Sequence, residues 1–394
     1  MLRFVFLLIL TPLFGFAQYA VKGKIINESD GKPIAKASIY LSNTTIGTTT
    51  ADDGTFSLNN VKQGQYDFIA SVVGFESAQL NITVNTNLNL ETIKLKPTTT
   101  QLNEVVIRPD KEWEQNYAMF KTQLFGMTDF AAKCKILNPE ILDLENDKQK
   151  HLLTGKSNGY LDIVNDALGY KLHYNLVSFE FDYRHNSFYY QWSVLYEELK
   201  GSRSQQKRWS KNREKAYYGS AEHYFKSALN SQTEREGFKT LTLLKKPNML
   251  RPPDSLIRAK VRMFDALVKA HSSRQNSDSL NYWLNKSSLP KINQYLISKP
   301  VHIDSMIHRT DVKGIYALAF KDYMYIIFNE SIKKADAYNY EVSPNTSVAQ
   351  ITDPYLFFDT NGVIANLHGV IYEGDWARRR VATLLPVDYE PERK

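Results

Sequence analysis

The sequence predicts a β-rich chain of the α+β class, in which an N-terminal seven-stranded β-sandwich precedes a larger α+β domain with an antiparallel sheet. Three observations predict it. Apolar and polar residues alternate over short runs between residues 19 and 95, as in half-buried strands. Turn residues separate these runs. Beyond residue 110, apolar residues with helical spacing occur between further alternating runs, which indicates a mixed domain.

The predicted sandwich occupies residues 18–96. Alternating runs lie at residues 21–25, 37–41, 66–72, 82–84 and 93–95. The turn signals between the runs are Asp30-Gly31, Asp53-Gly54, Gly64 and Gly74. About seven short strands in about 77 residues fit two packed sheets better than a helical fold.

Several short motifs follow one another in this region. They are Val21-Lys-Gly-Lys-Ile, Gly31-Lys-Pro-Ile, Ala37-Ser-Ile-Tyr, Gly47-Thr-Thr-Thr, Asp53-Gly-Thr-Phe and Gly64-Gln-Tyr-Asp. In this order they resemble the carboxypeptidase regulatory-like domain. The resemblance implies a transthyretin-like β-sandwich. In zinc carboxypeptidases such a domain follows the catalytic unit, whereas in many bacterial envelope proteins it stands at the N-terminus without one.

Residues 1–17 are predicted to be a cleaved signal peptide. Arg3 precedes an apolar run at residues 4–10, and small residues stand at Gly15 and Ala17, before Gln18. This pattern is typical of a secretory leader, and the run is too short for a transmembrane anchor. We therefore expect an exported protein that is periplasmic, associated with the outer membrane or on the cell surface. The net charge of +7 is mild, so we expect no nucleic-acid partner but allow peripheral attachment to a membrane.

Residues 97–109 are predicted to link the two domains. The tract is polar and β-branched, and it ends in the short apolar run 102–107 before Arg108-Pro109. Residues 101–107 resemble the segment that follows this sandwich in TonB-dependent outer-membrane receptors, where it leads to the plug. The remaining chain lacks the long train of amphipathic strands that a receptor barrel needs. The resemblance therefore implies an envelope location and not transport.

The second domain, residues 110–394, is predicted to contain helices and an antiparallel sheet. Helices are expected at residues 113–130, 204–229, 256–270 and 279–284, with 204–229 the longest. Strands are expected within 160–199 and at 238–244. Near the C-terminus, Lys321-Asp322 is expected to close a hairpin between residues 315–320 and 323–328, and residues 359–362 a second hairpin between 355–358 and 363–372. Motifs such as Cys134-Lys-Ile-Leu-Asn-Pro and Leu385-Pro-Val-Asp-Tyr resemble a group of envelope proteins that carry this N-terminal domain and have no established activity.

Motifs of the obvious enzyme classes do not occur. A zinc carboxypeptidase needs a His-x-x-Glu pair and a distant His, and none of the eight histidines is followed by Glu three residues later. Neither His-Glu-x-x-His nor Gly-x-Ser-x-Gly occurs, and Lys150 stands where a phosphate loop ending in Gly155-Lys-Ser157 needs its first glycine. We therefore predict no catalytic residue, no metal site and no cofactor.

A candidate binding site lies in the predicted helix 204–229. Its residues are Trp209, Asn212, Arg213, Tyr218 and His223. Beside the aromatic strand at 188–192, they would form a stacking and hydrogen-bonding platform for a glycan or peptide. In the alternative interpretation, Trp209 and Tyr217 anchor the helix to the sheet, and Arg213 pairs with a buried acid.

Our leading hypothesis is a non-catalytic, exported cell-envelope protein that serves as a binding or scaffolding module for another envelope component. The second hypothesis is an unrecognised hydrolase acting on peptide or cell-wall glycan, because two acids brought together by folding leave no sequence signature. A third is an accessory to a TonB-dependent transporter, for which residues 101–107 are the only support.

Overall fold

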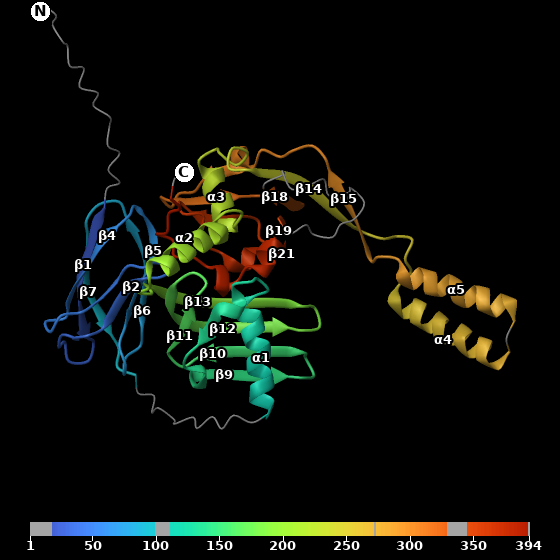
Figure 1. Ribbon diagram of the computed structural model, residues 1–394, viewed down its shortest axis with the longest axis horizontal. Helices are drawn as coiled ribbons and strands as arrows, with labels where there is room; N and C mark the ends of the chain where they lie inside the picture. Colours follow the sequence, from blue (N-terminus) through green and yellow to red (C-terminus); the bar gives the residue numbers. More distant parts are fainter. Residues whose placement is uncertain (1–17, 99–110, 272, 329–344, 393–394) are drawn as a thin grey trace, which may run out of the picture.

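The computed structural model describes residues 18–98, 111–271, 273–328 and 345–392. The predicted signal peptide lies outside these residues, as do the TonB-receptor-like segment 101–107 and most of the predicted linker. Figure 1 shows three regions of the described chain: the N-terminal strands, a central body of sheets and helices, and a pair of helices that projects to one side.

The N-terminal residues form a sandwich of two sheets. Its strands are β1 (Tyr19–Asn27), β2 (Ser38–Leu41), β3 (Gly47–Thr49), β4 (Thr55–Val61), β5 (Gly64–Ser71), β6 (Ala78–Val84) and β7 (Leu88–Leu95). One sheet has the order β4-β1-β7 and the other β3-β2-β5-β6. The residues that alternate toward the interior, such as Val21, Ile25 and Phe68, are fully buried. The prediction of a seven-stranded sandwich is confirmed.

A six-stranded antiparallel sheet follows. Its strands are β8 (Cys134–Ile136), β9 (Leu142–Asp147), β10 (Leu152–Ser157), β11 (Tyr160–Asn165), β12 (Tyr170–Asp182) and β13 (Ser187–Glu198). β12 pairs with β13 along one side and with β11 and β10 along the other. Helix α1 (Lys111–Phe125) covers this sheet and packs Phe120 against Phe179 of β12, with ring centroids 4.9 Å apart. This part of the chain has its own apolar core.

The remaining strands form two further sheets, which share a separate apolar core. The larger sheet has the order β15-β14-β18-β19-β21 and the smaller the order β16-β17-β20. Their bounds are β14 (Phe238–Pro247), β15 (Ile292–Ile297), β16 (Ile307–Arg309), β17 (Ile315–Leu318), β18 (Tyr323–Phe328), β19 (Thr346–Ile351), β20 (Leu356–Asp359) and β21 (Val370–Gly374). Tyr224, Phe225, Phe358 and Trp376 meet in the core between them. The α+β class with antiparallel sheets is thereby confirmed.

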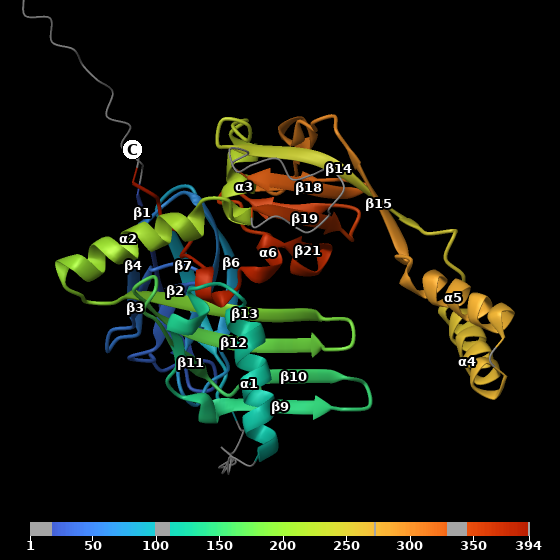
Figure 2. The ribbon, with the colours of Figure 1, turned by 45° about the vertical axis from the view of Figure 1, so that its right-hand side comes forward.

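The α-helices that follow α1 along the chain are α2 (Arg203–Tyr217), α3 (Ala221–Leu229), α4 (Asp254–Ala270), α5 (Arg274–Ser288) and α6 (Asp375–Arg378). Single turns of 3₁₀ helix lie at Ala131–Lys133, Pro139–Ile141, Ile303–Met306, Leu367–Gly369 and Val381–Thr383. Helices α4 and α5 form a hairpin at the end of the β14–β15 ribbon, and the hairpin projects away from the rest of the molecule in both views (Figures 1 and 2).

The predicted long helix 204–229 is wrong, because the chain breaks into α2 and α3. Gly219 has a φ of +79° between them, and a helix cannot continue through that conformation. Ser220 then caps α3, because its Oγ accepts a hydrogen bond from the backbone N of His223 at 3.1 Å. A glycine followed by a capping residue is a break signal that the apolar spacing alone had hidden.

Two other local predictions are also wrong. The helix expected at 279–284 runs over Arg274–Ser288, where Ser273 caps its start. No hairpin joins residues 315–320 to 323–328: β17 pairs with β16 and β20, whereas β18 pairs with β14 and β19. The chain crosses from one sheet to the other at Lys321-Asp322, so this pair of residues marks a change of sheet.

The sandwich is joined to the central body by backbone hydrogen bonds. The turn between β2 and β3 lies beside β13, where Asn43 N donates to Val194 O at 2.7 Å and Tyr196 N donates to Thr44 O at 2.9 Å. On its other side, Val387 N donates to Asn43 O at 2.7 Å. The turn therefore pairs with β13 on one side and with the C-terminal segment on the other.

Candidate functional site

Helix α2 begins at a capping box and lies across the end of the six-stranded sheet. Ser202 N donates to Gln205 Oε1 at 2.9 Å, and Ser202 Oγ accepts from Gln205 N at 3.4 Å. Such reciprocal bonds satisfy two backbone donors that the first turn leaves free. They orient the helix so that the predicted residues Trp209, Asn212 and Arg213 face the turn between β11 and β12.

These three side chains bind consecutive carbonyl oxygens of that turn. Trp209 Nε1 donates to Asp166 O, Asn212 Nδ2 to Ala167 O, and Arg213 Nε to Leu168 O, each at 2.8 Å. The turn ends at Gly169, where φ is +73° and a Cβ atom would lie 2.2 Å from the Trp209 indole. Trp209 is 1% exposed. The arrangement agrees with the anchoring interpretation of Trp209 and leaves little of the indole for a ligand.

Arg213 has a second set of contacts at the surface. Its guanidinium lies 3.9 Å from the centroid of the Tyr170 ring and donates to Glu198 Oε1 at 2.7 Å. Stacking and a charge-assisted hydrogen bond both favour a fixed orientation. The acid that Arg213 pairs with is exposed, with 59% of the Glu198 side chain accessible. The alternative interpretation had expected a buried acid.

Tyr218 and His223 lie at the break between α2 and α3, away from the three anchoring residues. His223 is 3% exposed, accepts from Gly219 N at Nδ1 and lies 3.2 Å from Glu236 Oε2 at Nε2. Burial lowers the pKa of His223, and the Glu236 carboxylate opposes that shift. Tyr218 is 36% exposed and packs edge-on against His223. The five predicted residues therefore form two groups and not one platform.

A groove of about 710 Å³ opens beside Arg213, and we call it the junction groove. Three separate parts of the chain line it: the β2–β3 turn, helix α2 with the adjoining sheet, and the C-terminal segment. Its lining residues are Thr45, Tyr170, Glu198, Arg203, Gln206, Lys207, Ser210, Arg213, Pro386, Asp388, Tyr389, Glu390 and Glu392. Of the predicted site residues, only Arg213 is among them.

The C-terminal wall of the junction groove is tied to the sandwich. Asp388 Oδ1 accepts from Thr45 N at 2.9 Å, and the Asp388 carboxylate also accepts from Thr45 Oγ1. Lys62 Nζ donates to Glu390 Oε1 at 2.7 Å. These side chains lie more than 300 residues apart in sequence, so only docking of the sandwich brings them together.

The two walls of the junction groove carry opposite charge. Helix α2 contributes Arg203 and Lys207, which are exposed and have no ion-pair partner among the described residues. The C-terminal wall contributes Asp388, Glu390 and Glu392. Tyr170 and Tyr389 add aromatic surface, and burial raises the pKa of Tyr389 to about 12, so its phenol is neutral and can donate or accept a hydrogen bond at neutral pH.

Sequence reasoning missed most of the junction groove. Leu385-Pro-Val-Asp-Tyr is recognisable as a motif, but nothing in it predicts that it lines a groove. Thr45 carries no sequence signal beyond its place in a turn. The spacing of Arg203, Lys207 and Ser210 along one helix face was the available clue, because residues three and four apart lie side by side.

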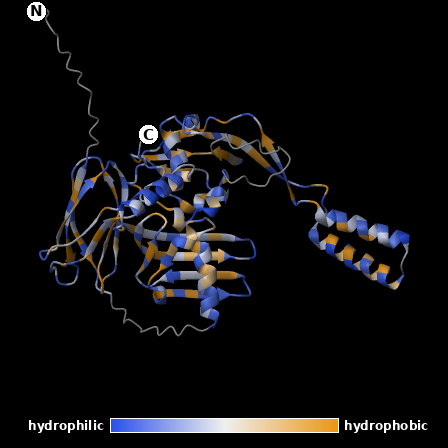
Figure 3. Cartoon of the chain, in the orientation of Figure 1, coloured by the Kyte–Doolittle hydropathy of each residue, from blue (hydrophilic) through white to orange (hydrophobic). Residues whose placement is uncertain are grey.

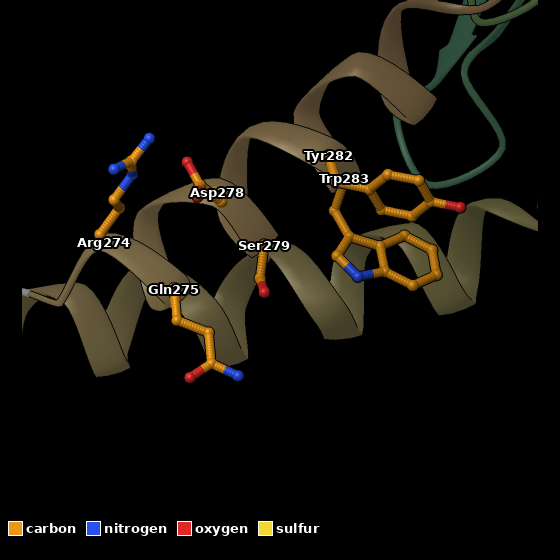
Figure 4. A pocket seen from close by; sticks show the side chains of 6 residues that line it. All are labelled: Arg274, Gln275, Asp278, Ser279, Tyr282 and Trp283. Carbon is orange, nitrogen blue, oxygen red and sulfur yellow. The ribbon is translucent and has the colours of Figure 1, made fainter.

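A shallower depression lies on helix α5. Arg274, Gln275, Asp278, Ser279, Tyr282 and Trp283 line it, and all six belong to one helix (Figure 4). A ligand held there would have one wall and would keep most of its surface in water, which is unlike the usual concave small-molecule site. We therefore do not treat the depression as a site.

The structure offers neither a metal centre nor a membrane-crossing helix in its described part. Over residues 18–98, 111–271, 273–328 and 345–392, no three His, Cys, Asp or Glu side chains are grouped as a metal ion requires. None of the helices in these ranges combines the length and the apolar character needed to cross a membrane.

Among the comparisons with known proteins, the family model matches the N-terminal part of the chain. No curated protein matches the sequence. Among solved structures, a type II cohesin–X-dockerin complex from Acetivibrio cellulolyticus is 23% identical over 19% of this chain and 52% of that chain, with a TM-score of 0.17. The pilus 2b backbone protein of group B streptococcus is 16% identical over 21% of this chain and 42% of that one, with a TM-score of 0.18. The chain thus spans about half the length of these first two structures.

The 5-hydroxyisourate hydrolase of Klebsiella pneumoniae is 17% identical over 20% of this chain and 91% of that chain, with a TM-score of 0.18. The family model described as CarboxypepD_reg-like domain matches residues 21–107. That match and the two-sheet topology agree with the motifs of the sequence. Residues 21–107 are therefore a carboxypeptidase regulatory-like domain, and the described residues of this range, 21–98, form a β-sandwich.

Proposed function

We propose that this protein is a non-catalytic, exported component of the cell envelope, and that the junction groove binds an extended peptide segment of another envelope component. The observation that carries the proposal is the composition of the groove. Three parts of the chain that are distant in sequence build it, and its lining combines cations, anions and two tyrosines. Open grooves with several hydrogen-bonding groups suit recognition of an extended chain.

The charges favour a peptide over a neutral glycan. Arg203 and Lys207 line one wall and Glu392 lines the other, and Tyr170 and Tyr389 also line the groove. A peptide can present a carboxylate and an amine a few residues apart and so pair with both walls. A neutral sugar chain would leave these charges without compensation, although it could still stack on Tyr170 or Tyr389.

The proposal is tested with a bead-displayed library of random peptides and the chain from Gln18 onward. We expect enrichment of peptides that carry both charge signs, and at least a tenfold loss of their affinity in the double variant Arg203→Ala, Lys207→Ala. The matched control, Lys94→Ala with Lys211→Ala, removes the same charge from exposed positions outside the groove and is expected to bind normally. Failure to enrich any peptide, or equal loss in both variants, would contradict the proposal.

The hydrolase alternative has one supporting observation. Burial raises the pKa values of Glu222, to about 8, and of Asp359, and carboxyls with raised pKa are typical of general acids. Neither residue lines the junction groove. Mass spectrometry of the enriched peptides, after incubation with the protein, separates the two functions: intact peptides support binding, whereas cleavage that is lost in Glu222→Gln supports the hydrolase.

A further inference from the structure

The helical hairpin α4–α5, with the residues that join it to the β14–β15 ribbon, forms a defined arm that we place at residues 248–291. Arg251 holds its base, because Nη1 donates to the carbonyl oxygens of Lys286, Ser287 and Leu289 at 2.5–3.0 Å. Asn248 Nδ2 donates to Pro290 O at 2.9 Å. Bonds to the last carbonyls of a helix satisfy groups that its C-terminus leaves free. The arm is thus braced where it leaves the body, and both views show it clear of the sheets (Figures 1 and 2).

Helix α4 has two apolar faces. The first, at Ile257, Val261, Phe264 and Val268, is buried or half-buried and has the spacing of a face packed on a neighbouring helix; α5 is the helix that α4 contacts. The second face is exposed and consists of Leu256, Ala259, Met263, Ala266, Leu267 and Ala270.

The exposed face of α4 is large and continuous along the helix. Leu256, Met263 and Leu267 are 42%, 42% and 41% exposed, and the three alanines fill the same stripe between them. Apolar residues are visible on the arm at the α4 helix (Figure 3). Single exposed apolar side chains are normal, but a contiguous stripe at helical spacing marks a surface that another body covers.

The arm also carries most of the excess positive charge of the chain. Residues 248–291 contain eight Lys or Arg and three Asp, whereas the rest of the sequence contains 41 basic and 39 acidic residues. Most of the net charge of +7 therefore belongs to the arm. Among the described residues, Arg258, Lys260 and Arg262 have no ion-pair partner, and Lys260 and Arg262 border the exposed face on its two sides.

We propose that the exposed face of α4 docks onto an anionic lipid surface. A helix with an apolar stripe between cationic borders lies flat at a bilayer interface, with its apolar side chains among the acyl chains and its Lys and Arg reaching the phosphates. Attraction to anionic lipid then adds to the apolar contact. The proposal concerns the arm alone and does not depend on what the junction groove binds.

A second copy of the chain is the competing occupant, and the charge argues against it. A two-fold contact would place the same patch of both subunits face to face. Lys260, Arg262 and their neighbours would then oppose their own copies, and like charges facing each other weaken association. An anionic surface removes that conflict.

The test is flotation of the chain from Gln18 onward with lipid vesicles. One set contains equal parts of phosphatidylglycerol and phosphatidylcholine, and the other contains phosphatidylcholine alone. We expect the protein to float with the first set only, and to be released as salt is raised, because screening shortens the reach of surface charge. The double variant Met263→Glu, Leu267→Glu is expected to bind at least tenfold more weakly.

The matched control is Asn281→Glu with Asn285→Glu, which adds the same charge to the exposed outer side of α5. We expect it to retain most of the vesicle binding, because it leaves the α4 face intact. Absence of flotation by the unmodified chain, or equal loss in the two double variants, would overturn the proposal. Sedimentation equilibrium tests the competing occupant. If the unmodified chain is a dimer and the double variant Met263→Glu, Leu267→Glu is a monomer, the proposal is overturned in favour of a second copy.

Discussion

Glu222 offers a direct test of the electrostatics around helix α3. It lies half-buried in the first turn of α3. Burial raises the pKa of Glu222 to about 8, the Lys226 ammonium one turn later opposes the rise, and the charges of Asp359 and Asp388 add to it. The folded protein thus binds a proton at Glu222 far more tightly than the unfolded chain, where the pKa is near 4.5.

The sign of the pH dependence follows from linkage. A carboxyl whose pKa is higher in the folded state makes the protein most stable below the unfolded pKa, and the stability falls as the pH rises toward the folded pKa. Each pH unit between about 4.5 and 8 costs about 1.4 kcal/mol. Between about pH 5 and pH 7 the unmodified protein should therefore lose about 2–3 kcal/mol that the variant Glu222→Gln, which cannot ionise, does not lose.

The assay is urea unfolding of both proteins at a series of pH values. We expect the unfolding free energies to converge near pH 5 and Glu222→Gln to be the more stable protein at pH 7. The control Glu140→Gln changes an exposed glutamate and should follow the unmodified protein at every pH. If Glu222→Gln and the unmodified protein gave parallel curves from pH 5 to pH 7, the reasoning about burial would be refuted.

Three further predictions concern packing and capping. Trp209→Ala should lower the unfolding free energy by about 3–5 kcal/mol, because it empties the space against Gly169; a change under about 1 kcal/mol in urea unfolding would contradict this. Ser220→Ala should cost about 1 kcal/mol through loss of the α3 cap, whereas Ser204→Ala, at an exposed position in α2, should cost much less in the same assay. Arg251→Ala should loosen the base of the arm, so limited proteolysis should cut between β14 and α4 sooner while the sandwich stays protected; an unchanged cleavage pattern would show that the three carbonyl contacts do not brace it.

The sandwich could be predicted in detail because its information is local. Alternation places Val21, Ile25 and Phe68 inward whatever the rest of the chain does, and glycine and aspartate turns mark where each strand ends. The same local logic located α4, whose start after Pro252-Pro253 and whose apolar spacing both lie within one stretch of sequence.

Local patterns misled where the neighbours in space decide the outcome. β17 and β18 alternate as a hairpin would, yet each pairs with strands of a different sheet, since strand partners depend on long-range contacts that no short window contains. Trp209 and Arg213 had the composition of a binding platform. Their donors instead meet the carbonyl oxygens of the turn at 166–169, and only the folded position of that turn makes those contacts available.

The sequence by itself determined the class of the fold, the sandwich with its turns, and the helix at residues 256–270, because each depends on the order of side chains over a few neighbouring residues. The tertiary structure decided the junction groove and which face of α4 remains uncovered. The physical reason is that a groove and an uncovered face are properties of how separate segments dock. Thr45, Arg213 and Asp388 share no pattern in sequence, and the backbone hydrogen bonds of the β2–β3 turn bring them together.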